Sequence, residues 1–158
     1  MKKLLAMVLV IVMVMSMASC GNAGGDADTV GSILLEEFMA NPEGTAQEIA
    51  DRFVASENIP FMGVAAEVEP GLLAGFDNAE ITGFEEGAMF CPMMSTIPFI
   101  GYVFKLADDA DVETFKQTLQ ENANLRWNIC TEAEELVVGS EGNTVFFLMC
   151  PTSFETEE

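Results

Sequence analysis

Two stretches of this chain decide its fold: residues 97–106, which read IPFIGYVFKL, and residues 144–150, which read TVFFLMC. Apolar side chains occupy successive positions in both stretches. Because neighbouring side chains on a strand point to opposite faces of a sheet, this pattern predicts strands that are apolar on both faces. Both faces must then be covered: if every helix packs on one face, the other face is covered either by the loop 57–78 or by another protein. In the second case we expect Phe99 and Phe147 to contact the partner.

The segment before these strands predicts two helices and a loop. Residues 30–56 follow a helical pattern that is interrupted once, by Asn-Pro-Glu-Gly at 41–44. Thr45 and Glu48 have the spacing of a capping box, so the second helix should begin there. Residues 57–78 are rich in Pro and Gly, which predicts a loop with at most a short strand at 63–68.

The rest of the chain predicts a pair of strands, a helix and a hairpin. These are strands at 79–90 and 97–106, a helix that Asp108 or Asp109 caps and that ends near Asn124, and a hairpin of 135–138 with 144–150. The order is therefore α-α-β-β-α-β-β. Antiparallel hairpins covered by helices are the natural packing of that order, so we expect an α+β fold, a two-layer sandwich, with 30–158 as a single domain.

Charge and composition limit the expected functions. Two of the six basic residues lie in 1–19, so residues 20–158 carry four cations against 26 carboxylates, a formal charge of −22. Nucleic acid binding needs clustered Lys and Arg, so we expect no nucleic acid partner. The chain has no histidine, which excludes Ser-His-Asp and Cys-His mechanisms. Adjacent acids such as Glu85 and Glu86 leave open an acid-only hydrolase, but on a strand they point to opposite faces. We therefore expect no enzyme.

The first 20 residues have the pattern of an export signal. Two lysines precede the apolar run 4–15, which is too short to cross a bilayer permanently. The segment Ala18-Ser19-Cys20 that follows resembles the lipobox of bacterial lipoproteins. This resemblance implies removal of residues 1–19, a diacylglyceryl group on Cys20, and anchoring at the extracytoplasmic face of the bacterial cell membrane. Residues 20–29 are then the lipidated cysteine and a flexible tether.

The order of elements behind a lipobox, with ADDADVETFK at 107–116, also resembles small uncharacterised lipoproteins of Gram-positive anaerobic bacteria. That resemblance covers most of residues 30–150. It implies no activity, cofactor or site residue for this chain.

Soft sulfur donors gather around Cys91 and again at Cys150. In an extended segment Met89, Cys91 and Met93 face the same way, and thiolate with thioether ligands selects Cu(I). The alternative is that these side chains fill gaps in the core. With Cys130 there are three thiols outside the expected anchor, so one disulfide at most can form and one thiol is left over.

Arg126 lies beside the only tryptophan, Trp127, in the amide-rich stretch 122–128. A guanidinium, an indole and amides suit a pocket for a small sugar or peptide. The same residues also fit a helix C-terminus, where Arg interacts favourably with the helix dipole and Trp packs. Both interpretations remain open at this point.

We therefore expect a membrane-anchored lipoprotein that acts as a binding or assembly module, with an envelope protein or a second copy of the chain as partner. The alternatives are binding of a soft metal or of a small ligand. No cofactor is predicted.

Overall fold

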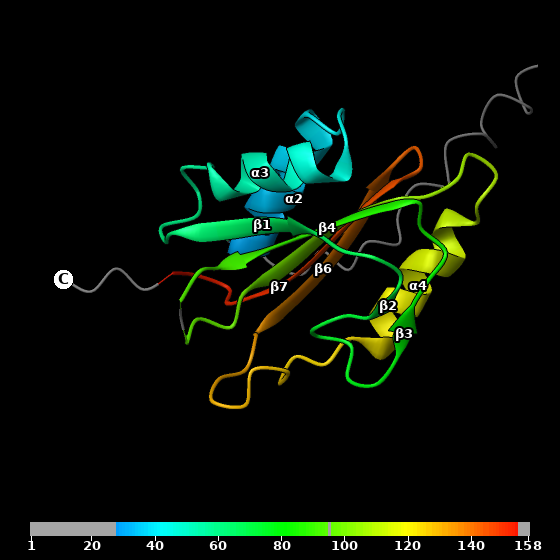
Figure 1. Ribbon diagram of the computed structural model, residues 1–158. Coiled ribbons are helices and arrows are strands. Elements are labelled where there is room, and N and C mark those ends of the chain that lie inside the picture. The colour runs from blue at the N-terminus through cyan, green and yellow to red at the C-terminus, as the bar shows by residue number, and fades with distance from the viewer. Residues whose placement is uncertain (1–27, 95, 155–158) are drawn as a thin grey trace, which may run out of the picture.

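The structure is a computed structural model that describes residues 28–94 and 96–154, and a five-stranded antiparallel sheet forms its centre (Figure 1). The helices and strands are α2 (Val30–Ala40), α3 (Ala46–Val54), β1 (Gly63–Glu67), β2 (Gly71–Leu72), β3 (Glu80–Ile81), β4 (Glu86–Pro92), β5 (Ile100–Lys105), α4 (Val112–Asn122), β6 (Glu135–Glu141) and β7 (Thr144–Cys150). The sheet has the order β1-β4-β5-β7-β6, and β2 pairs with β3 in a separate ribbon. The α+β class and the predicted order of elements are confirmed.

The strands β5 and β7 lie in the middle of the sheet, and every residue in them except Lys105 is buried. Their register pairs Val103 with Phe146 and Tyr102 with Phe147. Val103 and Phe146 belong to one apolar cluster, while Tyr102 and Phe147 belong to a second cluster on the opposite face. The prediction of strands that are apolar on both faces is therefore confirmed.

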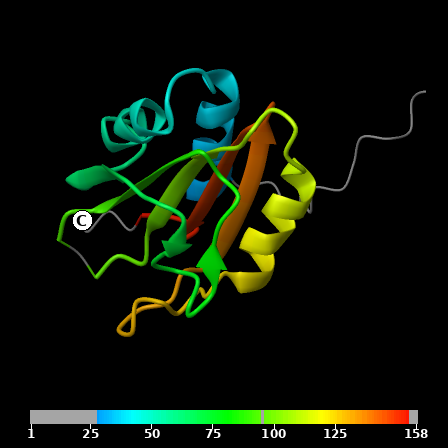
Figure 2. The same cartoon turned by 45° about the vertical axis from the view of Figure 1, so that its right-hand side comes forward.

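One face of the sheet is covered by α2 and α3 (Figure 2). The capping box that begins α3 forms as predicted: Thr45 accepts the N–H of Glu48, and the Glu48 carboxylate accepts the N–H of Thr45. This start directs Phe53 onto the sheet, where its ring stacks on Phe90 with centroids 4.8 Å apart. Phe53 thus lies on the buried face of α3, with Ile49 and Ala50.

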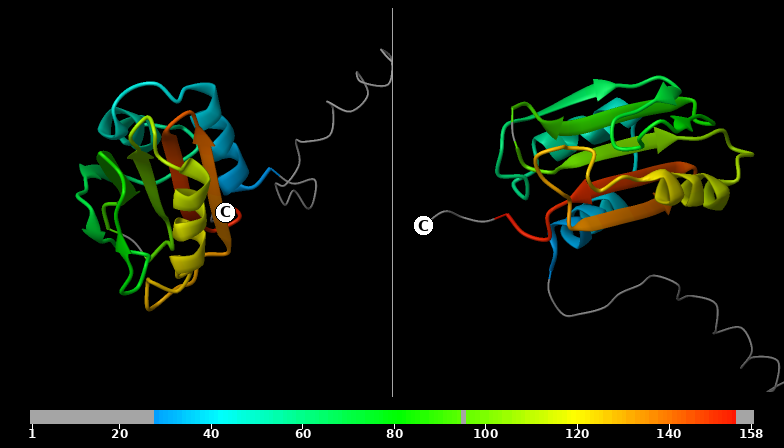
Figure 3. Two further views of the ribbon diagram at one scale, coloured as in Figure 1. Left: turned by 90° about the vertical axis from the view of Figure 1, so that its right-hand side faces the viewer. Right: turned by 90° about the horizontal axis from the view of Figure 1, so that it is seen from below.

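The opposite face is covered by α4 and by the segment that carries β2 and β3 (Figure 3). Leu119 of α4 is fully buried there, as are Phe76 and Ile81. The ring of Phe76 lies 4.7 Å from that of Phe147. Part of the expected loop 57–78 therefore covers this face, and α4 completes the cover.

The N-cap of α4 differs from the prediction. Asp111 begins the helix, and its carboxylate accepts the backbone N–H of Thr114 at 3.0 Å. Asp108 and Asp109 are instead the central residues of a turn, in which the N–H of Ala110 donates to Ala107 O. In a run rich in aspartate the position of the cap depends on the chain path before the helix, which the residue types do not reveal.

Two strands also differ from their predicted bounds. The expected strand 79–90 is divided into β3 and β4, because the chain turns at Gly83, whose φ is +93°. The strand predicted at 135–138 continues to Glu141. A tight turn at Gly142, where φ is +57°, and Asn143 then joins β6 to β7.

Residues 1–27, which include the expected signal, Cys20 and most of the expected tether, lie outside the residues that the structure describes. Thr29 was expected in the tether, but it caps α2 and donates to Glu135 Oε1 at 2.8 Å. The folded part of the chain therefore includes Thr29. Among the described residues, no helix is long and apolar enough to span a bilayer.

Candidate functional site

The two residues of the predicted ligand pocket, Arg126 and Trp127, line a hollow of about 460 Å³. The hollow forms where the segment after α4 meets the segment after β2, so it joins parts of the chain that are far apart in sequence. Its lining residues are Leu73, Ala74, Gly75, Asp77, Asn78, Asn124, Arg126, Trp127 and Ile129.

Asn124 holds the two sides of this hollow together. Its backbone N–H donates to Gly75 O at 2.8 Å, and its side-chain amide donates to the carboxylate of Asp77. Its side-chain oxygen accepts the N–H of Arg126 at 2.8 Å. Gly75 has φ +94°, a backbone conformation that residues with a side chain rarely adopt, so this turn requires glycine. The loop lies close to the sheet, since a Cβ on Gly75 would be 2.7 Å from Met149 Cε. The hollow is thus fixed to the sheet.

The side chains around the hollow suit a ligand with hydroxyl groups. Trp127 is half-buried and packs against the cluster under α4, while Arg126 is exposed. The Nε of Arg126 lies 3.5 Å from Glu132 Oε2 at the surface, and such an exposed pair is weak. An indole offers an apolar face to a sugar ring, and the polar ends of Asp77 and Asn78 can exchange hydrogen bonds with its hydroxyls.

Sequence reasoning missed Asp77 and Asn78. Asp77 has φ +52°, a left-handed conformation that Asp and Asn adopt more readily than most residues. Gly75 and Asn78 mark a turn in the sequence, but no local pattern shows that this turn lies beside Trp127.

The predicted partner surface at Phe99 and Phe147 is not present, because both side chains are buried and lie on opposite faces of the sheet. The ring of Phe61 covers Phe99 at a centroid distance of 5.0 Å, and Phe154 packs on the same ring. Phe76 covers Phe147. Both side chains are therefore covered by other parts of the same chain and not by another protein.

The predicted sulfur ligands do not converge. Met89 and Cys91 pack toward the cluster under α4, Met93 is exposed, and Cys150 is fully buried in the cluster under α2 and α3. Burial raises the pKa of the Cys91 thiol; burial and the nearby charge of Glu135 raise that of Cys150, which disfavours the thiolates that a metal requires.

The described residues contain no group of three or more His, Cys, Asp or Glu side chains able to hold a metal ion. Cys91, Cys130 and Cys150 are all free thiols. The alternative that Met and Cys fill the core fits Met89 and Cys150.

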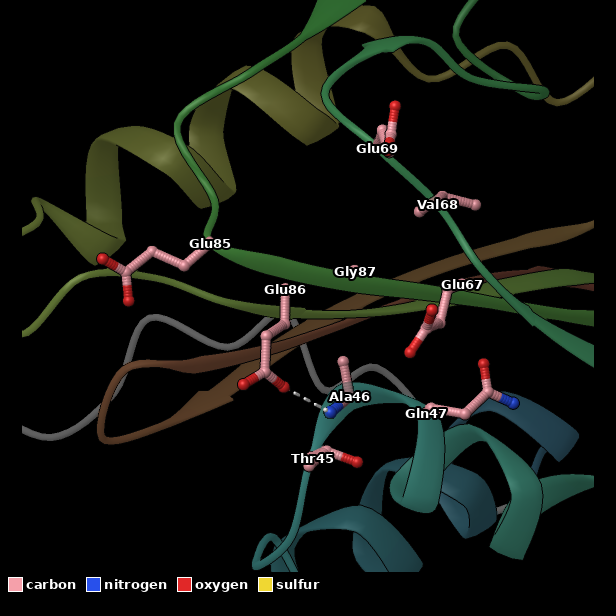
Figure 4. A pocket seen from close by; sticks show the side chains of 9 residues that line it. All are labelled: Thr45, Ala46, Gln47, Glu67, Val68, Glu69, Glu85, Glu86 and Gly87. Atoms are coloured by element: carbon pink, nitrogen blue, oxygen red, sulfur yellow. Dashed lines mark hydrogen bonds between the residues drawn. The ribbon is translucent and has the colours of Figure 1, made fainter.

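The acidic residues that the sequence singled out, Glu85 and Glu86, line a second hollow, of about 390 Å³, between the N-terminus of α3 and the end of β1 (Figure 4). Figure 4 shows Glu86 and Glu67 turned toward α3, while Glu69 and Glu85 point away from it. The Glu86 carboxylate accepts the N–H of Ala46 at 3.1 Å. The N-terminus of α3 explains the position of Glu86, because the positive end of a helix dipole favours a carboxylate.

Two exposed carboxyl groups have pKa values that depart from the ordinary range. Hydrogen bonds from Thr114 lower the pKa of Asp111, and hydrogen bonds from Thr152 lower that of Glu134. An acid-only hydrolase needs a carboxyl group that retains its proton, which requires a raised pKa. The pKa values of Asp111 and Glu134 are lowered instead, so neither carboxyl group suits that role.

Comparison with protein-family models, with curated proteins and with solved structures gave no match for this chain.

Proposed function

We propose that this chain is a lipid-anchored lipoprotein on the extracytoplasmic face of the bacterial cell membrane, and that it binds a small sugar and does not catalyse a reaction. The anchor is proposed at Cys20, after the apolar run 4–15 and the lipobox-like Ala18-Ser19. Thr29 lies only nine positions further on, so the tether holds the folded domain within about 30 Å of the lipid.

The main support for a ligand site is that Trp127 and Arg126 line one hollow together with Asp77 and Asn78. A neutral sugar suits it better than an anionic peptide, because the chain from Cys20 onward carries a formal charge of −22. Arg126 is one of only four cations in that part of the chain, and Glu132 shares its charge.

Trp127 provides a direct test because it is the only tryptophan in the chain. Tryptophan emission would be recorded while glucose, N-acetylglucosamine and an acetylated dipeptide are titrated in turn. We expect one of the two sugars to shift the emission with saturation, and we expect Asn78→Ala to weaken that binding by about tenfold. Lys116→Ala, on α4 and outside the lining of the hollow, is the control that should leave the affinity unchanged.

Saturation by the dipeptide alone would replace the sugar with a peptide ligand. The probes would be titrated up to about 10 mM, a concentration at which even weak sugar binding is detected. If no probe changes the tryptophan emission, the proposed ligand site is contradicted.

The anchor requires a separate experiment. The full chain would be produced in a Gram-positive host, and its membrane fraction compared with that of Cys20→Ser. We expect the wild type in the membrane fraction, with a mass increased by the lipid, and the variant released. Equal membrane retention of both proteins would contradict lipidation at Cys20.

A further inference from the structure

Strand β1 is one edge of the sheet, and half of its backbone groups point away from the molecule. The N–H of Val68 donates to Gly87 O, and the N–H of Met93 donates to Met62 O. In an antiparallel pair, hydrogen-bonded and non-hydrogen-bonded positions alternate. The backbone groups of Val64 and Ala66 therefore point to β4. Those of 63, 65 and 67 point outward, and among the described residues they have no hydrogen-bond partner.

One side of this edge is also open. Residue Gly63 packs under α3, near Val54, but Val64 on the other side is 38% exposed. The chain beside it adds three exposed methionines, Met62, Met93 and Met94, which are 75%, 55% and 90% exposed. This group of four side chains, called here the methionine patch, lies at the start of β1. Flexible thioether side chains adapt to varied apolar partners.

The other end of β1 is acidic. Glu67 ends the strand and Glu69 follows it, and both line the hollow that Glu85 and Glu86 also line. Figure 4 shows these carboxylates around the end of β1 on different sides, so they form a rim and do not converge on one ion. The edge thus offers free backbone groups along its length, an apolar patch at one end and negative charge at the other.

We propose that the β1 edge binds an extended, basic segment of another envelope protein, which adds to the sheet as a sixth strand. Main-chain hydrogen bonds to residues 63, 65 and 67 would give affinity. Apolar side chains of the segment would lie on the methionine patch, and Lys or Arg would lie beside Glu67 and Glu69.

Charge decides between a basic partner and a second copy of the chain. Each copy carries a formal charge of −22 from Cys20 onward, so two copies that pair through β1 repel each other, whereas a basic segment is attracted. Like charges brought together across an interface are a common means of excluding the wrong partner. The β1 edge is separate from the proposed sugar site, and the two hollows share no lining residue.

The probe is a fluorescein-labelled peptide of about ten residues that alternates valine and lysine, a typical strand length and pattern. Its affinity would be measured by fluorescence anisotropy at about 0.15 M salt, where nonspecific attraction is screened. Two related peptides are compared with it. One carries glutamate in place of lysine, and the other carries N-methyl groups that block the hydrogen bonds of one edge.

We expect the lysine peptide to bind, and the glutamate and N-methylated peptides to bind at least tenfold more weakly. Ala65→Pro removes only a backbone N–H that points outward, and it should weaken binding of the lysine peptide by a similar factor. The double variant Glu67→Gln/Glu69→Gln should weaken binding several-fold. Its matched control, Glu36→Gln/Glu141→Gln, neutralises two exposed carboxylates near the opposite edge and should leave binding unchanged.

Circular dichroism of Ala65→Pro checks that the variant is folded. If it is not, the N-methylated peptide still tests the backbone contact without any change to the protein. Equal binding of the lysine and N-methylated peptides would overturn the proposal, as would absence of binding. A stable dimer of the wild type that Ala65→Pro disperses would assign the edge to a second copy and would also overturn it.

Discussion

The two edges of the central sheet differ in how they are covered. Strand β6 lies between two helices: its residue Val137 packs in the cluster under α2, while Leu136 and Val138 pack in the cluster under α4. Strand β1 has α3 on one face only, and Val64 and Ala66 are exposed on the other. An edge strand with helices on both faces is shielded by their side chains, whereas one with a single helix is open to another chain.

Residue type explains much of this difference. Strand β6 reads ELVVGSE and presents large apolar side chains to both helices, whereas β1 reads GVAAE. Small residues let α3 approach β1 closely, but they bury little apolar area on the opposite face.

The largest effect is expected for Phe147→Glu compared with Val64→Glu. Phe147 is fully buried beside the closed edge, so a carboxylate there should cost more than about 4 kcal/mol and leave the chain largely unfolded. Val64 is exposed on the open edge, so its variant should change stability by less than about 1 kcal/mol. Urea unfolding followed by circular dichroism measures both. If Phe147→Glu stays folded and changes only the oligomeric state, Phe147 belongs to a partner surface, as the sequence predicted.

A proline pair tests which backbone groups of β1 are free. Ala66→Pro should cost about 1–3 kcal/mol, because it removes an N–H that points to β4 and leaves a carbonyl unpaired. Ala65→Pro should cost less than about 1 kcal/mol, because its N–H points outward, where edge strands tolerate proline. Thermal unfolding compares the two, and equal losses would mean that the assigned alternation is wrong.

Gly31→Ala and Gly63→Ala compare the helix contacts at the two edges. A Cβ on Gly31 would lie 2.5 Å from Val137 Cγ2 and 2.7 Å from the Glu135 carboxylate, so we expect a loss of about 1–2 kcal/mol despite the better helix propensity of alanine. A Cβ on Gly63 would lie 3.4 Å from Val54, an ordinary contact, so that variant should change stability by less than about 0.5 kcal/mol. Chemical denaturation of both variants would show whether the β6 edge is the tighter one.

The smallest effect is a pH dependence at the closed edge. Glu134 precedes β6 and accepts the N–H and hydroxyl of Thr152, which lowers its pKa in the folded state. Its contribution to stability is therefore fully present above the ordinary glutamate pKa and is lost as the pH falls through the lower folded-state value. We expect Glu134→Gln to lose less stability than the wild type between about pH 5 and pH 3, by unfolding measured at each pH. Parallel curves for the two proteins would contradict this.

Local signals in the sequence predicted the elements that depend on local contacts. The capping box at Thr45 and Glu48 and the two-sided apolar pattern of β5 and β7 each appear as predicted. The cap of α4 was misassigned, because three aspartates in 108–111 offer nearly the same local chemistry.

Tertiary arrangement decided the rest. Arg126 and Trp127 could be singled out because they are adjacent, but Asp77 comes close to them only in the folded chain, where Asn124 donates hydrogen bonds to Asp77 and to Gly75 O. Cys91 and Cys150 follow similar sequence patterns, yet they lie on opposite faces because register assigns each residue of a strand to one face.

The most direct test of the difference between the edges is a backbone amide NMR spectrum of the isotopically labelled protein, with and without the valine–lysine peptide. We predict the largest changes at residues 63–67, with residues 135–141 unaffected. Larger changes at 135–141 than at 63–67 would contradict the assignment of β1 as the open, binding edge.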